Sequence, residues 1–450
     1  MDSFVIEGGR RLEGTVSING AKNAALPLMA AALLTSQPVK LRDVPPLADI
    51  RSMVKLMGEL GCQRAEPDPT SSVMTLHSTD ETASHARYDI MRTMRAGICV
   101  LGPMLARRGF ARVSMPGGCA IGDRPVDLHL RGLAALGATI KLQGGDITAE
   151  VHDRGRRLRG GRIFMGGPFG STVLGTANVM SAACLARGTT IIESAACEPE
   201  IVDLAILLTS MGAKIEGAGS PRIIVHGVEE LGGADHRVIP DRIEAGTFMC
   251  AAAITNGTLT LENCPVDALM AVMDRMEAAG VHFRYIGPDG VPVNEPADAM
   301  RATLRVTCDR VLRPVEITTQ PHPGFPTDLQ AQLMALLTLS EGNSVITEKI
   351  FPERFLHVAE LSRMGARLFR QGPTVVVSGV RKLVGAPVMA SDLRASASLV
   401  LAGLAAEGTT TVNRVYHLDR GYEKMEERLN ALGAAIQRVD EKELATVAGA

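Results

Sequence analysis

Apolar runs of helical length alternate along this chain with segments that mix apolar and polar residues. The runs NAALPLMAAALL (23–34) and SASLVLAGLAA (396–406) are apolar nearly all round, which predicts helices buried on every side. The segments DIRSMVKLMGELG, EIVDLAILLTSMG and RGYEKMEERLNALG are amphipathic and predict helices that cover a flank. Between them, TTIIES and TTTVNRV alternate apolar with polar residues, as strands with one solvated face do. The pattern predicts central helices surrounded by outward-facing sheets.

This order of elements repeats six times. The copies begin at Asn23, near Arg95, and at Gly175, Gly246, Thr327 and Arg394. They close at Leu60-Gly61-Cys62, Leu136-Gly137-Ala138, Met211-Gly212-Ala213, Ala279-Gly280-Val281, Met364-Gly365-Ala366 and Leu432-Gly433-Ala434. A linker at Gly232 to Pro240 (GGADHRVIP) divides three copies from three, which predicts two similar domains. A doubly wound parallel sheet is the alternative that periodicity alone leaves open.

Composition narrows the class of protein. The 450 residues are 46% hydrophobic and 21% charged, as in globular proteins, and the net charge is −2. With 3% aromatic residues and no basic run, nucleic-acid binding is not favoured. No secretory signal is visible at the start, and the apolar stretch Ala24 to Leu34 is too short to span a bilayer. Eight widely spaced cysteines argue against a disulfide scaffold or a zinc site. We expect a soluble cytoplasmic α/β protein.

A cation opens three of the predicted helices, where the helix dipole disfavours positive charge: Lys22, Arg95 and Arg394. Each could simply be a solvated residue on an exposed first turn. Because all three occupy equivalent places in the repeats, we interpret them as anion-binding groups beside free backbone N–H groups. The substrates are therefore expected to be anionic.

Further candidate chemistry lies in three motifs. Cys119 lies in the Gly-rich loop PGGCAIGDRPVDLH beside Arg124, where a thiol of low pKa can act as a nucleophile or proton donor. Cys62, Cys99, Cys184 and Cys250 are interpreted instead as core residues. Asp328 in HPGFPTDLQAQ could complement a helix dipole, since Thr327 and Gln330 have capping-box spacing, or accept a proton from a hydroxyl. Arg420 in YHLDRGYE could pair with Glu423 or clamp an anion. The chain has no P-loop, GxSxG or HExxH motif, and GGPFGSTVLGT is a weak dinucleotide signal.

Taken in order, eight motifs resemble those of the UDP-N-acetylglucosamine 1-carboxyvinyltransferases, a family of enolpyruvyl transferases. They are GAKNAALP, TMRAG, PGGCAIGDRPVDLH, AACEPEIVDL, PDRIEAGTF, HPGFPTDLQAQ, DLRASASLVLAG and YHLDRGYE, and they span essentially the whole chain. The resemblance implies a two-domain inside-out α/β barrel, with three repeats in each domain. One domain would comprise residues 22–239 and carry the Cys loop, and the other residues 1–21 plus 240–450. The active site would lie in the interdomain cleft.

The family's reaction moves the enolpyruvyl group of phosphoenolpyruvate to the 3′-hydroxyl of UDP-N-acetylglucosamine and releases phosphate, as the first committed step of peptidoglycan synthesis. It runs through a tetrahedral ketal with no metal and no cofactor. By resemblance, Cys119 is the general acid and the target of fosfomycin-type epoxides, and Asp328 is the base. Lys22, Asn23, Arg124, Arg394 and Arg420 would bind phosphoenolpyruvate, with Arg354 as a further contributor to the anionic site. The residues that would contact the nucleotide sugar are Arg95, Arg124, Pro125, Val126, Asp127, Leu128, Val173, Leu174, Gly175, Asp328 and Ile350.

Two departures from the family pattern stand out. Cys197 replaces an arginine that the family often has, and the segment GGPFGSTVLGT is longer than usual and lacks a preceding lysine. A rival interpretation is the sister enzyme, 3-phosphoshikimate 1-carboxyvinyltransferase, which lacks the PGGC loop. A second rival is a non-catalytic paralogue that binds a nucleotide sugar. Such a protein would need no acid and base, so it would have no reason to retain Lys22, Cys119, Asp328 and Arg420 together.

Overall fold

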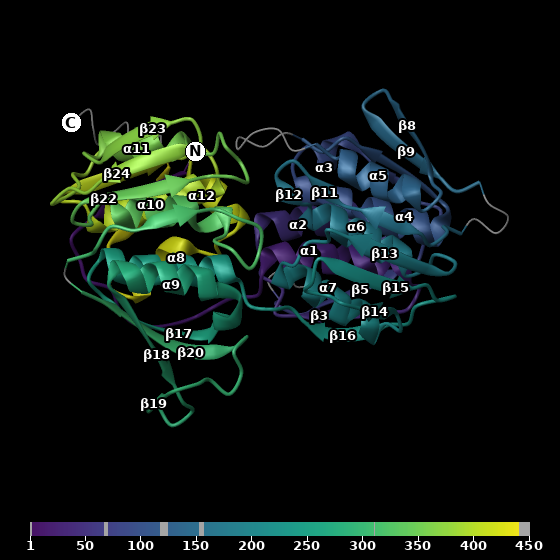
Figure 1. Cartoon of the computed structure of the whole chain (residues 1–450), viewed down its shortest axis with the longest axis horizontal. Coiled ribbons are helices and arrows are strands. Elements are labelled where there is room, and N and C mark those ends of the chain that lie inside the picture. The colour runs from purple at the N-terminus through teal and green to yellow at the C-terminus, as the bar shows by residue number, and fades with distance from the viewer. Residues whose placement is uncertain (1, 67–70, 118–124, 153–156, 310, 441–450) are drawn as a thin grey trace. The chain divides into compact units, whose positions relative to one another are not determined.

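A computed structural model describes residues 2–66, 71–117, 125–152, 157–309 and 311–440. The described chain forms two compact units (Figure 1). We call residues 20–117 and 125–239 the N-unit, and residues 2–19 together with 240–440 the C-unit. Each unit contains three copies of one repeat, built from a buried helix, a strand, a covering helix and an antiparallel strand pair.

The helices of the N-unit are α1 (Lys22–Ala31), η1 (Ala32–Leu34), α2 (Ala48–Glu59), α3 (Tyr88–Met91), η2 (Arg95–Val100), α4 (Leu101–Arg108), α5 (Asp127–Ala135), α6 (Val173–Ala183) and α7 (Pro199–Ser210). Its strands are β3 (Val39–Arg42), β4 (Cys62–Arg64), β5 (Met74–Ser78), β6 (His85–Ala86), β7 (Phe110–Ser114), β8 (Thr139–Gln143), β9 (Asp146–Glu150), β10 (Arg162–Phe164), β11 (Gly166–Gly167), β12 (Gly170–Ser171), β13 (Thr189–Glu193), β14 (Lys214–Glu216), β15 (Arg222–His226) and β16 (Ala234–Arg237). They form sheets ordered β16-β3-β5-β4, β6-β7-β9-β8 and β10-β13-β15-β14, and the short pair β11-β12.

The helices of the C-unit are α8 (Arg242–Ile254), η3 (Val266–Leu269), α9 (Met270–Ala279), η4 (Thr327–Leu329), α10 (Gln330–Leu337), α11 (Leu356–Arg363), α12 (Leu393–Ala405), η5 (Val415–Arg420) and α13 (Met425–Ala431). Its strands are β1 (Asp2–Glu7), β2 (Glu13–Ser17), β17 (Thr258–Cys264), β18 (Val281–Ile286), β19 (Pro292–Val293), β20 (Ala302–Cys308), β21 (Glu316–Thr318), β22 (Asn343–Thr347), β23 (Arg367–Gln371), β24 (Thr374–Ser378), β25 (Pro387–Met389), β26 (Thr409–Asn413) and β27 (Ile436–Asp440). Their sheets are ordered β19-β18-β20-β17-β2, β21-β22-β24-β23 and β25-β26-β1-β27.

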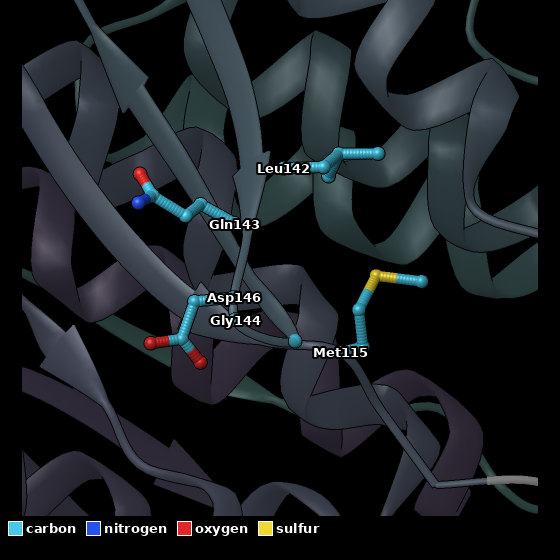
Figure 2. Close-up of a pocket in the computed structure, with 6 residues that line it drawn as sticks. Met115, Leu142, Gln143, Gly144 and Asp146 are labelled. Carbon is cyan, nitrogen blue, oxygen red and sulfur yellow. The ribbon is translucent and has the colours of Figure 1, made fainter.

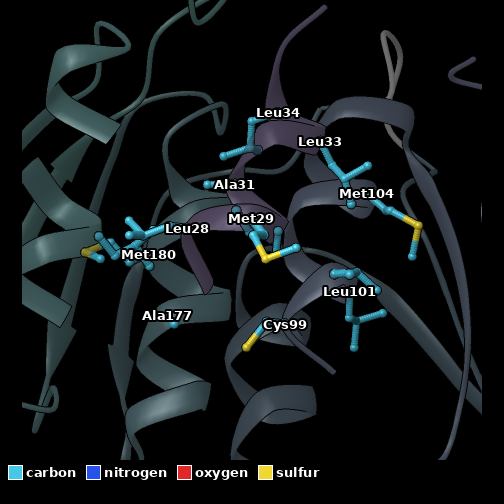
Figure 3. Close-up of a cluster of buried hydrophobic side chains, with 14 of the residues drawn as sticks. Leu28, Met29, Ala31, Leu33, Leu34, Cys99, Leu101, Met104, Ala177 and Met180 are labelled. Carbon is cyan, nitrogen blue, oxygen red and sulfur yellow. The ribbon is translucent and has the colours of Figure 1, made fainter. Parts of the chain in front are cut away.

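The first helix of the repeats is buried, as its composition predicts. Every residue of α8 after Arg242 is buried, and so is every residue of α10. In the N-unit, side chains from α1, α4 and α6 interdigitate in one cluster that includes Met29, Leu101 and Met180 (Figure 3). The covering helix α2 instead exposes Arg51 and Lys55. Burial all round one helix and along one side of the other therefore follows from the two hydrophobic patterns.

The closing glycine has the same backbone conformation in all six repeats. Gly61, Gly137, Gly212, Gly280, Gly365 and Gly433 have φ values of 74, 93, 107, 103, 93 and 102°. Each ends the covering helix in the left-handed region, where a Cβ atom is strained and glycine is not. The repeated Gly signal in the sequence therefore marks six equivalent chain reversals.

The sheets decide between the two architectures that periodicity left open. In β10-β13-β15-β14 only the edge strand β10 is parallel to its neighbour, and the other pairs are antiparallel. The repeats thus have separate mixed sheets, and the alternative of a single doubly wound parallel sheet is wrong.

The predicted linker at Gly232 to Pro240 also needs correction, because β16 occupies its centre and pairs in parallel with β3.

The N-terminal segment completes the C-unit. Strand β1 lies between β26 and β27 and is antiparallel to both, while β2 is parallel to β17. The first and the last repeat of the C-unit thus each take a strand from the N-terminal segment. Within the described residues, no helix is both long enough and apolar enough to cross a membrane.

Candidate functional site

The three buried helices of the C-unit are joined by the hydroxyl group of Tyr422. This oxygen lies 2.8 Å from Thr247 Oγ1 on α8, and it accepts hydrogen bonds from Gln332 Nε2 on α10 (3.3 Å) and Arg394 on α12 (3.2 Å). Tyr422 is 2% exposed, and its burial raises the pKa of the phenol. A neutral hydroxyl therefore connects one residue from each of the three repeats.

Asp328 is held by two arginines at this junction. Arg394 donates to Asp328 Oδ2 at 3.0 Å, and Arg354 donates to Asp328 Oδ1 at 2.8 Å. Burial by itself would raise the pKa of the Asp328 carboxyl, but the two guanidinium groups outweigh it and hold this pKa well below its usual range. Burial likewise would lower the pKa of Arg394, and the Asp328 carboxylate reverses the direction. Asp328, Arg354 and Arg394 therefore form one cluster of ion pairs, in which Asp328 and Arg394 are both charged at physiological pH.

The predicted capping box at this helix does not form. The Thr327 hydroxyl donates to Glu348 Oε2 and accepts from Arg354, and no side-chain hydrogen bond caps η4. The side-chain nitrogen and oxygen of Gln330 are buried and have no hydrogen-bond partner among the described residues. Ion pairing with Arg354 and Arg394 outweighs local capping here, because a charge-assisted hydrogen bond is roughly twice as strong as a neutral one.

The other predicted residues of this unit lie on neighbouring elements. Arg420 is the last residue of η5, two positions before Tyr422. Ile350 lies in the turn that follows β22, and its backbone N–H donates to Glu348. The structure therefore brings Asp328, Arg354 and Arg394 into direct contact. It places Ile350 shortly before Arg354 in the chain and Arg420 on the segment that carries Tyr422.

In the N-unit, Lys22 is the first residue of α1 and is 7% exposed. Its Nζ lies 2.9 Å from Oδ2 of Asp49, which is in the first turn of α2. The cation predicted at the helix start thus already has an anionic partner. Asn23, the next residue, is half-buried on the same turn. Both residues begin the first repeat, as the sequence predicts.

The remaining N-unit candidates lie at the starts of two helices. Arg95 opens η2 and donates to the backbone oxygen of Pro125 at 3.4 Å. Asp127 and Leu128 form the first turn of α5, preceded by Val126. Val173, Leu174 and Gly175 form the first turn of α6 rather than a loop, and Thr172 caps that turn through the N–H of Gly175. Arg95 and Pro125 are therefore in contact.

Two polar side chains connect these helix starts. Asn178 on α6 donates to Ile98 O in η2, accepts from Gly102 N in α4, and lies 2.9 Å from His129 Nδ1 on α5. Arg131 on α5 donates to the backbone oxygens of Phe164 and Gly166. The lengthened segment after Phe164, formed by the β11–β12 pair, is thus tied to the helix that carries Asp127 and Leu128.

Cys119 and Arg124 lie outside the described residues. The cysteines interpreted as core residues are buried, and their burial raises the pKa of Cys62, Cys99, Cys184 and Cys250 to about 12. These four thiols are therefore uncharged at neutral pH, as their interpretation as core residues requires.

A shallow surface pocket lies at the end of β7 and the turn between β8 and β9. Met115, Leu142, Gln143, Gly144, Gly145 and Asp146 line it (Figure 2). None of the predicted site residues contributes to it. Among the described residues, no three His, Cys, Asp or Glu side chains gather as metal ligands would.

Sequence reasoning missed Asp49, Tyr422 and Gln332. Asp49 looks like an ordinary acidic residue in a first turn, where it suits the helix dipole. Gln332 carried a usable signal, since it is a polar residue within a helix that is otherwise apolar nearly all round. Tyr422 lies in the YHLDRGYE motif, in which only Arg420 drew attention.

Solved structures identify the class of fold. The chain superimposes on the crystal structure of the enolpyruvyl transferase NikO from Streptomyces tendae with a TM-score of 0.85 and 26% identity, covering 97% of this chain and 99% of that one. EPSP synthase from Acinetobacter baumannii has the same fold, with a TM-score of 0.75 and 18% identity over 98% of this chain and 100% of that one. The predicted two-domain inside-out α/β architecture is confirmed, and it is that of the enolpyruvyl transferases.

Sequence comparison defines the family more closely. A family model described as EPSP synthase (3-phosphoshikimate 1-carboxyvinyltransferase) matches residues 6–429. Two curated relatives are named UDP-N-acetylglucosamine 1-carboxyvinyltransferase. The one from Methylacidiphilum infernorum is 51% identical over 98% of this chain and 100% of its own, and the one from Novosphingobium aromaticivorans is 52% identical over 98% and 99%. The chain therefore belongs to the EPSP synthase family of enolpyruvyl transferases, and it is an enzyme of the transferase class.

Proposed function

We propose that this protein transfers the enolpyruvyl group of phosphoenolpyruvate to the 3′-hydroxyl of UDP-N-acetylglucosamine. The 3′-oxygen bonds to C2 of phosphoenolpyruvate while its proton leaves and C3 gains a proton, which gives a tetrahedral ketal. The ketal then loses a proton from C3 as the bond from C2 to the phosphate oxygen breaks. The products are the enol ether and inorganic phosphate, so the atoms balance without an oxidant or a metal. The names of the curated relatives support this acceptor.

The arginine pair around Asp328 is the observation that carries the proposal. The side chains of Arg354 and Arg394 are 8% and 4% exposed, and they share one carboxylate. Two guanidinium groups thus converge on one carboxylate, and the next carboxylate of the series, Glu348, reaches Arg354 only through the Thr327 hydroxyl. A buried pair of guanidinium groups of this kind suits an anionic substrate such as phosphoenolpyruvate.

The same pairing suggests how Asp328 becomes a base. With both guanidinium groups in place, its pKa is too low for efficient proton transfer from a sugar hydroxyl. When the carboxylate or phosphate of phosphoenolpyruvate neutralises Arg394, the attraction on Asp328 weakens and the pKa of its carboxyl rises. Binding of one substrate thereby prepares the base for the other.

The remaining roles follow the resemblance. We assign to Cys119 protonation of C3 and reaction with fosfomycin-type epoxides. Lys22, Asn23, Arg124, Arg394 and Arg420 bind phosphoenolpyruvate. The nucleotide sugar is bound by Arg95, Arg124, Pro125, Val126, Asp127, Leu128, Val173, Leu174, Gly175, Asp328 and Ile350. We further place the reaction in the cytoplasm, in peptidoglycan synthesis, where it serves cell-wall growth, cell shape and division.

An acceptor assay tests the proposal. Phosphate release from phosphoenolpyruvate is measured with UDP-N-acetylglucosamine and, separately, with shikimate 3-phosphate, the acceptor of the sister enzyme. We expect turnover with the nucleotide sugar alone. Turnover with shikimate 3-phosphate alone would overturn the choice of acceptor, and a protein inactive with both would have to be a non-catalytic relative.

The role of Cys119 is tested by covalent labelling. Treatment with a fosfomycin-type epoxide followed by mass spectrometry should give an adduct that Cys119→Ser loses. Cys119→Asp, which still offers an acid, should retain some turnover. Cys197→Ser is the control, because burial raises the pKa of the Cys197 thiol and its loss should leave labelling intact. A fully active Cys119→Ala enzyme would show that the assignment is wrong.

A further inference from the structure

Glu348 is a fully buried carboxylate immediately after β22. Its exposed fraction is 0%, and both oxygens accept hydrogen bonds. Oε1 accepts from Thr319 Oγ1 (2.7 Å) and from the backbone N–H groups of Ile350 (2.8 Å) and Phe351 (2.9 Å). Oε2 accepts from Thr327 Oγ1 at 2.9 Å. The two oxygens thus hold different segments of the chain.

The Oε2 side leads to the arginine cluster. Thr327 Oγ1 accepts a hydrogen bond from Arg354 at 3.0 Å, so its own hydrogen points to Glu348. Arg354 uses the same nitrogen to donate to Asp328 Oδ1 at 2.8 Å. A continuous series of hydrogen bonds therefore runs from Glu348 through Thr327 and Arg354 to Asp328.

The Oε1 side fixes the turn at 349–351. Besides donating to Glu348, the Thr319 hydroxyl accepts from the backbone N–H of Lys349 at 2.9 Å. Three successive N–H groups of the turn are thus bound by Glu348 and Thr319. Ile350, assigned above to nucleotide-sugar binding, is the middle residue of this turn.

We propose that Glu348 is a positioning residue whose two oxygens serve the two ends of the reaction: Oε2 orients Arg354 against Asp328, and Oε1 shapes the turn that carries Ile350. The inference rests on the proposed function. A buried carboxylate serves this purpose well, because it accepts several hydrogen bonds at once and donates none. Glu348 touches neither substrate in this assignment.

Glu348→Gln separates the two oxygens. The amide oxygen satisfies the three donors at the Oε1 position, so the new NH₂ group faces Thr327. Thr327 Oγ1 then faces two donors while its own hydrogen has no acceptor, so its hydrogen bond with Arg354 weakens and Arg354 is held less firmly against Asp328. We expect kcat to fall about ten- to a hundredfold, while KM for the nucleotide sugar changes less than about twofold.

Three matched variants make the test specific. Thr327→Val breaks the same connection and should lower kcat as much as Glu348→Gln, whereas Thr327→Ser keeps the hydroxyl and should restore most of the rate. The double variant Glu348→Gln/Thr327→Val should be no slower than either single variant, because both act in one series. Thr319→Val, on the other oxygen, should raise KM for the nucleotide sugar and leave kcat unchanged.

The outcomes separate this inference from the proposed function. If the wild-type enzyme uses shikimate 3-phosphate instead, the proposed acceptor is wrong, and the same kcat comparison is made with that acceptor. If the wild type is active but Glu348→Gln and Thr327→Val keep its kcat, or if their effects multiply in the double variant, the positioning role is wrong. A loss of kcat that matches the loss of folded protein by circular dichroism also contradicts it. An enzyme inactive with every acceptor contradicts both.

Discussion

A single hydroxyl group, on Tyr422, joins side chains from three repeats of the C-unit. Tyr422→Phe keeps the ring but leaves Thr247, Gln332 and Arg394 without this partner. Thr247 and Gln332 keep other hydrogen bonds, so the main cost is the buried Arg394 donor that loses this acceptor. We expect a loss of about 1–3 kcal/mol in the free energy of unfolding, which urea denaturation measures. Tyr416→Phe is the control, since Tyr416 is 46% exposed and should change stability by less than about 0.5 kcal/mol. Equal effects of the two substitutions would argue against the junction.

Some residues of the site could be predicted from the sequence, but their partners in the fold could not. Asp328, Arg354 and Arg394 were predicted from motifs and helix starts, and they are in contact. The hydrogen bond from Thr327 to Glu348, in place of a helix cap, could not be predicted. The two residues are far apart in the sequence, and only the fold brings the end of β22 beside η4. Lys22 was predicted from its helix start, but its partner Asp49 lies on another helix.

The covering helices of the repeats end at glycines with positive φ. At Gly365 this backbone conformation, and not a lack of space, decides the cost of a substitution. Gly365 has a φ of 93° and no atom within 4 Å of the position of a Cβ, so Gly365→Ala is strained by the backbone alone. We expect a loss of about 1 kcal/mol in unfolding free energy. Gly58 lies inside α2 with equally open space, so Gly58→Ala should stabilise by about 0.5–1 kcal/mol. Thermal unfolding of both variants checks this, and effects of the same sign would contradict it.

Helix α11 carries a buried histidine that makes stability depend on pH. Burial, with a smaller contribution from Arg354 and against the pull of Asp392, lowers the pKa of His357 to about 4. Below pH 6.5 the unfolded chain binds a proton at this residue that the folded chain does not, so protonation favours unfolding. Between pH 6.5 and 4 this difference costs about 3 kcal/mol. Above pH 6.5 it costs nothing.

Comparison with His357→Leu isolates this contribution. Urea denaturation of both proteins at pH 7, 5.5 and 4.5 gives the difference in unfolding free energy at each pH. We expect this difference to shift steadily in favour of the variant as the pH falls. A difference that stays constant with pH would mean that folding does not shift the pKa of His357.

Helices and turns that depend on neighbouring residues could be predicted from the sequence, and strands that depend on a distant partner could not. The buried helices and the closing glycines follow from patterns within about a dozen residues, so the sequence predicts them. Strand β16 was missed because it pairs with β3, almost two hundred positions earlier, and its residues resemble those of a linker. Edge strands of this kind carry little periodicity of their own.

Both ends of the part of the chain that the structure describes belong to the C-unit. Asp2 of β1 pairs with Asp440 of β27, so the two ends of the described chain meet in one sheet. A permuted chain that runs from 240 to 440 and continues through a short Gly/Ser linker into residues 2–19 should therefore fold as an independent unit. Residues 240–440 alone lack β1 and β2 and should not. Circular dichroism and resistance to protease compare the two, and an equally folded fragment without β1 would contradict this account.

The place of β1 has a consequence for how the protein is made. On the ribosome, the N-unit has all of its strands once residue 239 has emerged, and it can fold while synthesis continues. Strand β1 is translated before the whole N-unit, yet its partners β26 and β27 are translated after it. Strand β1 must thus wait, unpaired, while the N-unit and most of the C-unit are made, and molecular chaperones that shield exposed strands have most to protect in that interval.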